Sequence, residues 1–173
     1  MASTRDKYTS NDFHGASCLP CFPGDNRDGR SYTSWCAEWM SLGLRMLHDG
    51  APILVFSDWR QLPSITDAMQ WAGFVWRGIA VWDKPNSRPQ RGRFRQQAEF
   101  IVWGSKGAMP FDRKVSPLPG VYSVLPPRER VHQTEKPLGL LRALVKIVEP
   151  GGRILDPFAG SGTTNAAAIL EGY

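Results

Sequence analysis

The chain has little of what a membrane protein or a disulfide scaffold needs. None of its apolar stretches approaches the roughly 20 residues of a membrane-spanning helix, and residues 1–8 lack the apolar core of a secretory signal. It has three cysteines: Cys18 and Cys21 form a C-x-x-C pair near His14, and Cys36 lies in an apolar helical pattern. Structural zinc needs four ligands. We therefore expect free thiols, no metal site, no membrane contact and a cytoplasmic location.

The glycine-rich segment near the C-terminus lacks the marks of two common phosphate-binding loops. No lysine follows Gly162, as a Walker A loop requires, and Asn165 stands where the dinucleotide fingerprint needs a third glycine. What remains in residues 153–164 is an apolar strand at 153–155, the acid Asp156, a glycine turn and a new helix. Ligands of α/β sheets bind at such strand ends, and glycines allow the backbone to approach a ligand closely. The segment predicts a nucleotide-type cofactor pocket.

A second motif lies upstream of the glycine segment. Residues 132–137 read H-Q-T-E-K-P and open an amphipathic helical stretch, which Glu149-Pro150-Gly151-Gly152 closes. Thr134 is a suitable N-cap and Pro137 suits the first helical turn. Taken alone, this motif is a plausible helix start and no more.

In this order and spacing, the two motifs together resemble those of the DNA amino-methyltransferases. That family uses S-adenosylmethionine to methylate adenine N6 or cytosine N4. The permuted members, with the catalytic half before the cofactor half, match best. The resemblance implies S-adenosylmethionine as cofactor and double-stranded DNA as partner, and leaves the oligomeric state open, a dimer included. It implies that the following residues form the cofactor site: Thr134, Lys136, Pro137, Asp156, Phe158, Gly160, Gly162 and Thr163.

The remaining pattern predicts an α/β fold. Helices are expected at 32–47 and 62–72, and strands at 52–56, 75–82 and 98–103, which are rich in branched and aromatic residues. We expect an incomplete Rossmann-like methyltransferase sheet, mainly parallel with an antiparallel terminal pair. A polar arm (1–31) would precede a partial methyltransferase domain (32–173). Within it we expect a basic loop (84–98), a short target-recognition region (106–131) and a cofactor-binding part (132–173).

Positive charge is concentrated in the predicted basic loop. The chain has 21 Lys and Arg against 16 Asp and Glu, a net charge of +5. From residue 84 to residue 98 there are five cations and no acid. A solvated loop is one interpretation. We favour contacts with DNA phosphates, which supply affinity without reading sequence, by Lys84, Arg88, Arg91, Arg93 and Arg95.

One family motif is missing. The catalytic tetrapeptide, Asp, Asn or Ser followed by Pro-Pro and an aromatic residue, occurs nowhere in the 173 residues; the only Pro-Pro pair, Pro126-Pro127, lacks both flanking groups. The catalytic residues are therefore unknown, and we expect an internal portion of a methyltransferase with reduced or absent activity. An RNA methyltransferase and a non-catalytic cofactor- or DNA-binding module remain alternatives. Pro20-Cys21 stands in the wrong order for a C5-cytosine enzyme. Adenine versus cytosine, the recognition sequence and a restriction, orphan or phage origin stay open.

Overall fold

The structure is a computed structural model, and it describes residues 27–127 and 135–173. The elements in chain order are α2 (Gly29–Met46), β1 (Pro52–Ser57), α3 (Leu62–Trp71), β2 (Val75–Asp83), β3 (Ala98–Ser105), β4 (Val121–Ser123), α4 (Leu138–Leu144), the 3-10 helix η1 (Val145–Ile147) and α5 (Thr163–Glu171). Helix α2 begins at Gly29, before the predicted start at 32, because Asp28 caps it. The Asp28 Oδ1 atom accepts hydrogen bonds from the backbone N–H groups of Arg30 (2.9 Å) and Ser31 (3.0 Å).

The four strands form one sheet in the order β1-β3-β2-β4. Strand β3 is antiparallel to both β1 and β2, and β2 is parallel to β4. Strands β1, β2 and β4 therefore run in one direction. The α/β class is confirmed, and so is the antiparallel pairing of β2 with β3. One detail differs from the expectation: the antiparallel strand β3 lies inside the sheet between β1 and β2, not at its end.

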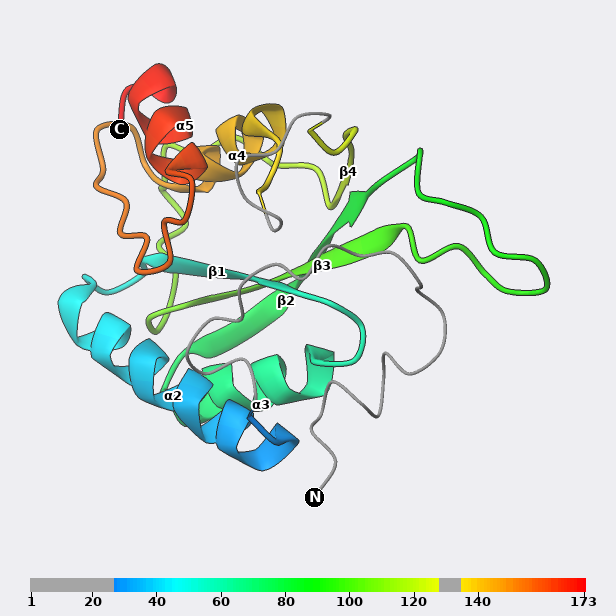
Figure 1. The fold of residues 1–173 in the computed structure, drawn as a ribbon. Coiled ribbons are helices and arrows are strands. Elements are labelled where there is room, and N and C mark those ends of the chain that lie inside the picture. The colour runs from blue at the N-terminus through cyan, green and yellow to red at the C-terminus, as the bar shows by residue number, and fades with distance from the viewer. Residues whose placement is uncertain (1–26, 128–134) are drawn as a thin grey trace.

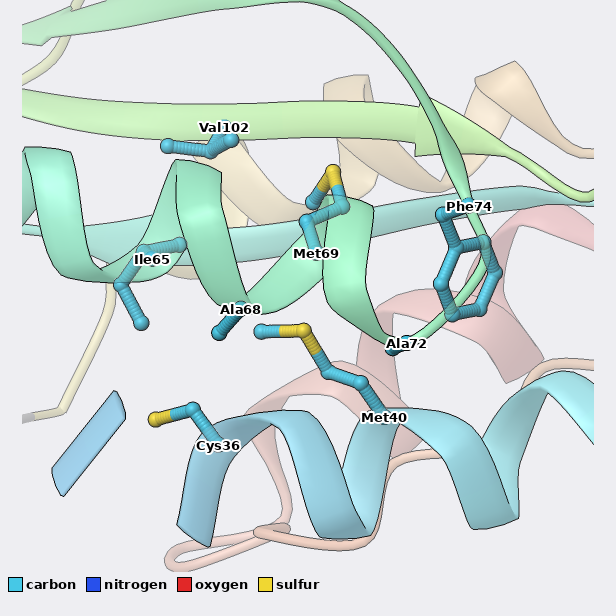
Figure 2. Packing of buried hydrophobic residues seen from close by; sticks show 8 residues of the cluster. All are labelled: Cys36, Met40, Ile65, Ala68, Met69, Ala72, Phe74 and Val102. Carbon is cyan, nitrogen blue, oxygen red and sulfur yellow. The ribbon is translucent and has the colours of Figure 1, made fainter. Parts of the chain in front are cut away.

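Helices cover both faces of the sheet, α2 and α3 on one and α4 and α5 on the other (Figure 1). Because side chains alternate along a strand, Ile53 and Val55 of β1 pack toward α2 and α3, whereas Leu54 and Phe56 pack toward α4 and α5. The first core contains Cys36 and Met40 of α2 against Ile65 and Met69 of α3, with Val102 of β3 on the side of α3 away from α2 (Figure 2).

Two local expectations near the C-terminus were wrong. Residues 153–155, predicted as a strand, are irregular, because no described strand lies beside them to supply backbone partners. Helix α4 begins at Leu138 with Pro137 as its N-cap, so the proline precedes the first turn. The Pro137 carbonyl accepts from the N–H groups of Leu140 (3.1 Å) and Leu141 (3.2 Å).

None of the helices in the described part of the chain is both long enough and apolar enough to cross a membrane.

Candidate functional site

The glycine segment forms a tight turn that leads into α5. Asp156 Oδ1 accepts a hydrogen bond from the Phe158 N–H at 2.9 Å. Gly160 (φ +52°) and Gly162 (φ +76°) both adopt left-handed conformations, which glycine takes without strain. A Cβ atom at Gly160 would meet only the Phe158 carbonyl oxygen, at 3.8 Å, and one at Gly162 would meet nothing within 4 Å. The turn therefore presents bare backbone, which a ligand can approach closely.

The side chain of Phe158 connects this turn to α2. Its ring centroid lies 5.0 Å from that of Trp39 and 5.7 Å from that of Trp35, with tilted or edge-on geometry. Phe158 is still 55% exposed. The segment from Ile154 to Gly162 descends beside the edge of the sheet that β1 forms (Figure 1). Aromatic contacts hold it there, and it is not hydrogen-bonded to β1 as a strand.

Lys136 of the second motif makes an ion pair on the sheet. Its Nζ atom lies 2.5 Å from Glu99 Oε1, and Lys84 Nζ lies 2.7 Å from Glu99 Oε2. The Glu99 side chain is 15% exposed. Both ammonium groups also lie over aromatic faces: Lys136 is 4.9 Å from the Phe56 ring, and Lys84 is 4.7 Å from the Trp82 ring. One carboxylate therefore joins the second motif to the ends of β2 and β3.

The two lysines determine the charge state of Glu99. Burial alone would raise the pKa of its carboxyl group, but the charge and hydrogen bonds of Lys136 and Lys84 outweigh burial and hold that pKa below its usual range. A carboxyl group whose pKa is lower in the folded state stabilises the fold at every pH above its unfolded pKa, about 4.3. That contribution is lost as the pH falls through the folded pKa.

We expect the substitution Glu99→Gln to lower the free energy of unfolding at pH 7 by roughly 2–3 kcal/mol. This is somewhat less than the cost of breaking a fully buried pair, because both lysines retain some access to water. Below about pH 4.3 the stability of the variant should also fall less steeply than that of the wild type, since the group that protonates there is gone. Urea unfolding at a series of pH values measures both effects.

Glu171→Gln is the matched control. Glu171 also pairs with two cations, Arg142 (2.6 Å) and Lys146 (3.0 Å), but both cations are about half exposed, so water solvates them when the carboxylate is removed. If the two variants lose equal stability, the ion pairs of Glu99 with Lys84 and Lys136 have no special structural role.

The predicted basic loop projects from the sheet between β2 and β3 (Figure 1). Its base is fixed: Asp83 accepts hydrogen bonds from Gln97 Nε2 (2.7 Å) and from Ser123 Oγ (2.8 Å), and the Lys84 N–H donates to the Gln97 carbonyl (2.9 Å). Of its five cations, Lys84 turns inward to Glu99. The other four are exposed: Arg88, Arg91, Arg93 and Arg95.

A hollow of about 200 Å³ opens next to the base of this loop, lined by Asp58 to Arg60, Lys84, Gln96, Ala98 and Glu99. It lies where β1 and β2 end. A larger, mostly apolar hollow of about 370 Å³ lies against the sheet, between Leu54, Trp103 and Tyr122 on one side and residues 113–120 on the other. Neither of these two hollows includes the glycine turn.

The structure brings together some of the predicted site residues and separates others. Asp156, Phe158, Gly160, Gly162 and Thr163 form one continuous turn, and Ser161 Oγ lies 2.8 Å from Thr163 Oγ1. Lys136 and Pro137 precede α4, and α4 packs against α5. Thr134 lies outside the described residues, as do His14, Cys18 and Cys21. Within residues 27–127 and 135–173, no group of three or more His, Cys, Asp or Glu side chains could hold a metal ion.

Sequence reasoning missed Glu99. The available signal was a lone acid in the otherwise apolar run 98–103, directly after the basic loop. A charged side chain within a strand that faces a core needs a partner, and two segments already identified each contain a lysine: Lys84 in the basic loop and Lys136 in the second motif.

The comparisons with known proteins agree with this architecture. A family model described as DNA methylase matches residues 22–120 and 112–173. The type II methyltransferase M2.MboI of Moraxella bovis is 28% identical over 152 residues, covering 77% of this chain and 55% of that protein. The type II methyltransferase M.HinfI of Haemophilus influenzae is 29% identical over 164 residues, covering 82% of this chain and 46% of that protein. This chain thus spans about half the length of the curated relatives it matches.

Solved structures support the fold. The crystal structure of an M1.HpyAVI–SAM complex superposes with a TM-score of 0.66 at 24% identity, covering 83% of this chain and 74% of that one. A structure of M1.HpyAVI alone gives a TM-score of 0.64 at 26% identity, covering 78% and 68%. Because the family model matches most of the chain, including the glycine turn and the basic loop, this protein belongs to the N6/N4 DNA methylase family.

Proposed function

We propose that this chain forms the cofactor- and DNA-binding part of a site-specific DNA methyltransferase acting in the cytoplasm. The reaction is transfer of a methyl group from S-adenosylmethionine to the exocyclic amino group of adenine (N6) or cytosine (N4). The observation that carries the proposal is the glycine turn: Gly160 and Gly162 expose their backbone directly before α5, in a chain of the N6/N4 DNA methylase family.

The turn fits a nucleoside-type cofactor in its chemistry. Asp156 uses Oδ1 for the Phe158 N–H, and its second carboxylate oxygen has no partner among the described residues, so it can accept from a hydroxyl or amine. The ring of Phe158 is half exposed and offers an apolar face. The residues that would hold the cofactor are Thr134, Lys136, Pro137, Asp156, Phe158, Gly160, Gly162 and Thr163. The bound cofactor would supply an electrophilic methyl group.

Lys136 has a structural task in this proposal. The Lys136 Nζ atom lies 2.5 Å from Glu99 Oε1 and 4.9 Å from the centre of the Phe56 ring. These contacts fix the start of α4. Because α4 packs on α5, this ion pair also sets the position of the helix that follows the glycine turn. We assign Lys136 to positioning the cofactor-binding part.

The DNA-binding surface in this proposal consists of the exposed arginines of the basic loop, Arg88, Arg91, Arg93 and Arg95. Lys84 is omitted because its ammonium group is paired with Glu99 at 2.7 Å. Contacts from these arginines to phosphates would supply affinity without reading bases. The loop follows β2 at the edge where β1, β2 and β4 all end, which is the edge at which α/β sheets bind their ligands.

Replacing Arg91, Arg93 and Arg95 together with Ala is expected to weaken the binding of all DNA sequences alike. The slope of log affinity against log salt should flatten by about 0.9 for each duplex phosphate contact removed. S-adenosylmethionine affinity should not change. Fluorescence anisotropy with labelled duplexes at several salt concentrations measures the slope.

A control triple variant removes the same charge elsewhere, at the exposed residues Arg30, Arg45 and Arg153. It should leave the slope close to that of the wild type. An unchanged slope in the loop variant, or an equal change in both variants, would mean that the loop makes no phosphate contacts.

A further inference from the structure

The tip of the basic loop carries a phenylalanine that the fold does not bury. Phe94 is 92% exposed and lies between Arg93 and Arg95. Burying such a side chain gains about 1.5–3 kcal/mol relative to leaving it in water, so a bound partner that covers the ring would gain binding free energy.

The geometry of the loop makes its tip a defined feature. The Arg93 N–H donates to the Gln90 carbonyl (3.3 Å). Gly92 has φ +72°, and a Cβ atom added there would meet nothing within 4 Å, so the chain reverses in open space. The base is fixed by the hydrogen bonds of Asp83 and Gln97 described above. Hydrogen bonds thus hold the two ends of the loop together, and the Gln90–Arg93 turn lies between them.

The neighbours of Phe94 indicate which partner would bury it. Arginines flank it on both sides, and the segment 84–98 contains no acid. An apolar patch for a protein partner would need several apolar neighbours, whereas a single ring between guanidinium groups suits a polyanion that also has apolar interior faces. DNA has both: phosphates outside and stacked bases within.

We propose that Phe94 inserts between DNA bases while the flanking arginines bind the adjacent phosphates. The inference rests on the proposed DNA-binding function and adds a base-stacking residue to it. Apolar side chains inserted at a base step unstack it at a cost of a few kcal/mol, and the cost is least where a base is already missing or unpaired. Phe94 should therefore make the chain bind more tightly to a duplex in which one base is missing from the stack than to an intact duplex.

The test compares two labelled duplexes of identical sequence, one intact and one with a single abasic site. The wild-type chain should bind the abasic duplex more tightly. Phe94→Ala should lose about 5- to 150-fold in affinity for the abasic duplex, the range of base–aromatic stacking, and should lose the preference between duplexes. Phe94→Tyr, which keeps the ring, should keep the preference. The salt slope should be the same in all three proteins, because the arginines remain.

Trp71→Ala is the matched control, since Trp71 is 73% exposed and precedes β2, at the end opposite to the loop. It should bind both duplexes as the wild type does. The inference is overturned if Phe94→Ala retains the abasic preference, or if Trp71→Ala loses as much. A wild-type chain with no salt-dependent DNA affinity would instead overturn the proposed function itself, and this inference with it.

Discussion

The 173-residue chain is expected to transfer no methyl group to DNA, even under conditions in which it binds both DNA and S-adenosylmethionine. The amino lone pair of adenine or cytosine is delocalised into the ring, so an enzyme must accept hydrogen bonds from the amine and hold it in line with the methyl group. In the family this requires a polar side chain, a main-chain carbonyl and a stacking ring around an extruded base. The sequence has no tetrapeptide that provides them.

Incorporation of labelled methyl groups into mixed-sequence duplex DNA measures this prediction, with the type II methyltransferase M.HinfI as the positive control. The expected signal for this chain is that of a protein-free blank. Sustained incorporation by the purified chain would show that other residues perform the amine-binding role. The hollow beside Trp59, Lys84 and Glu99 would then be the first place to look for them.

Elements with a strong local pattern could be predicted from sequence. Strand β1 was expected at 52–56 and spans Pro52–Ser57, and β3 was expected at 98–103 and spans Ala98–Ser105. Successive side chains of these strands point into two different cores. Both faces are therefore buried, and each strand is a continuous apolar run that is easy to recognise. Helix α3 begins and ends within a residue of its prediction, because Pro63 suits a helix start and Gly73 (φ +96°) a helix end.

Features that depend on partners distant in sequence could not be predicted. Residues 153–155 have the composition of a strand, but a strand requires a neighbour, and no described strand is adjacent. Lys84 looked like one of five equivalent cations until the fold brought Glu99 to 2.7 Å from it, across a separation of 15 residues. The glycine turn was recognisable because its backbone geometry is encoded locally, by glycines at 160 and 162.

Gly160→Val is expected to reduce S-adenosylmethionine affinity at least about 100-fold. A β-branched residue at φ +52° is strained by about 1–3 kcal/mol, so the turn would change shape. The added methyl groups would also occupy the space through which the ligand approaches the backbone. Isothermal titration calorimetry measures the affinity, and far-ultraviolet circular dichroism should remain close to that of the wild type.

Gly107→Val separates strain from ligand contact. Gly107 also has a left-handed conformation (φ +65°) and open space at its Cβ position, but it lies in the loop after β3. Both variants should lose similar stability, and only Gly160→Val should lose cofactor affinity. Equal affinity losses would mean that strain alone, and not the glycine turn, governs binding.

Ultraviolet cross-linking of labelled S-adenosylmethionine, followed by peptide mapping, would show whether the turn from Asp156 to Thr163 holds the cofactor. We expect saturable labelling of a peptide that contains residues 154–164, and this labelling should be competed by unlabelled ligand and absent in Gly160→Val. Saturable labelling confined to another segment, such as the basic loop, or no saturable labelling at all, would contradict it.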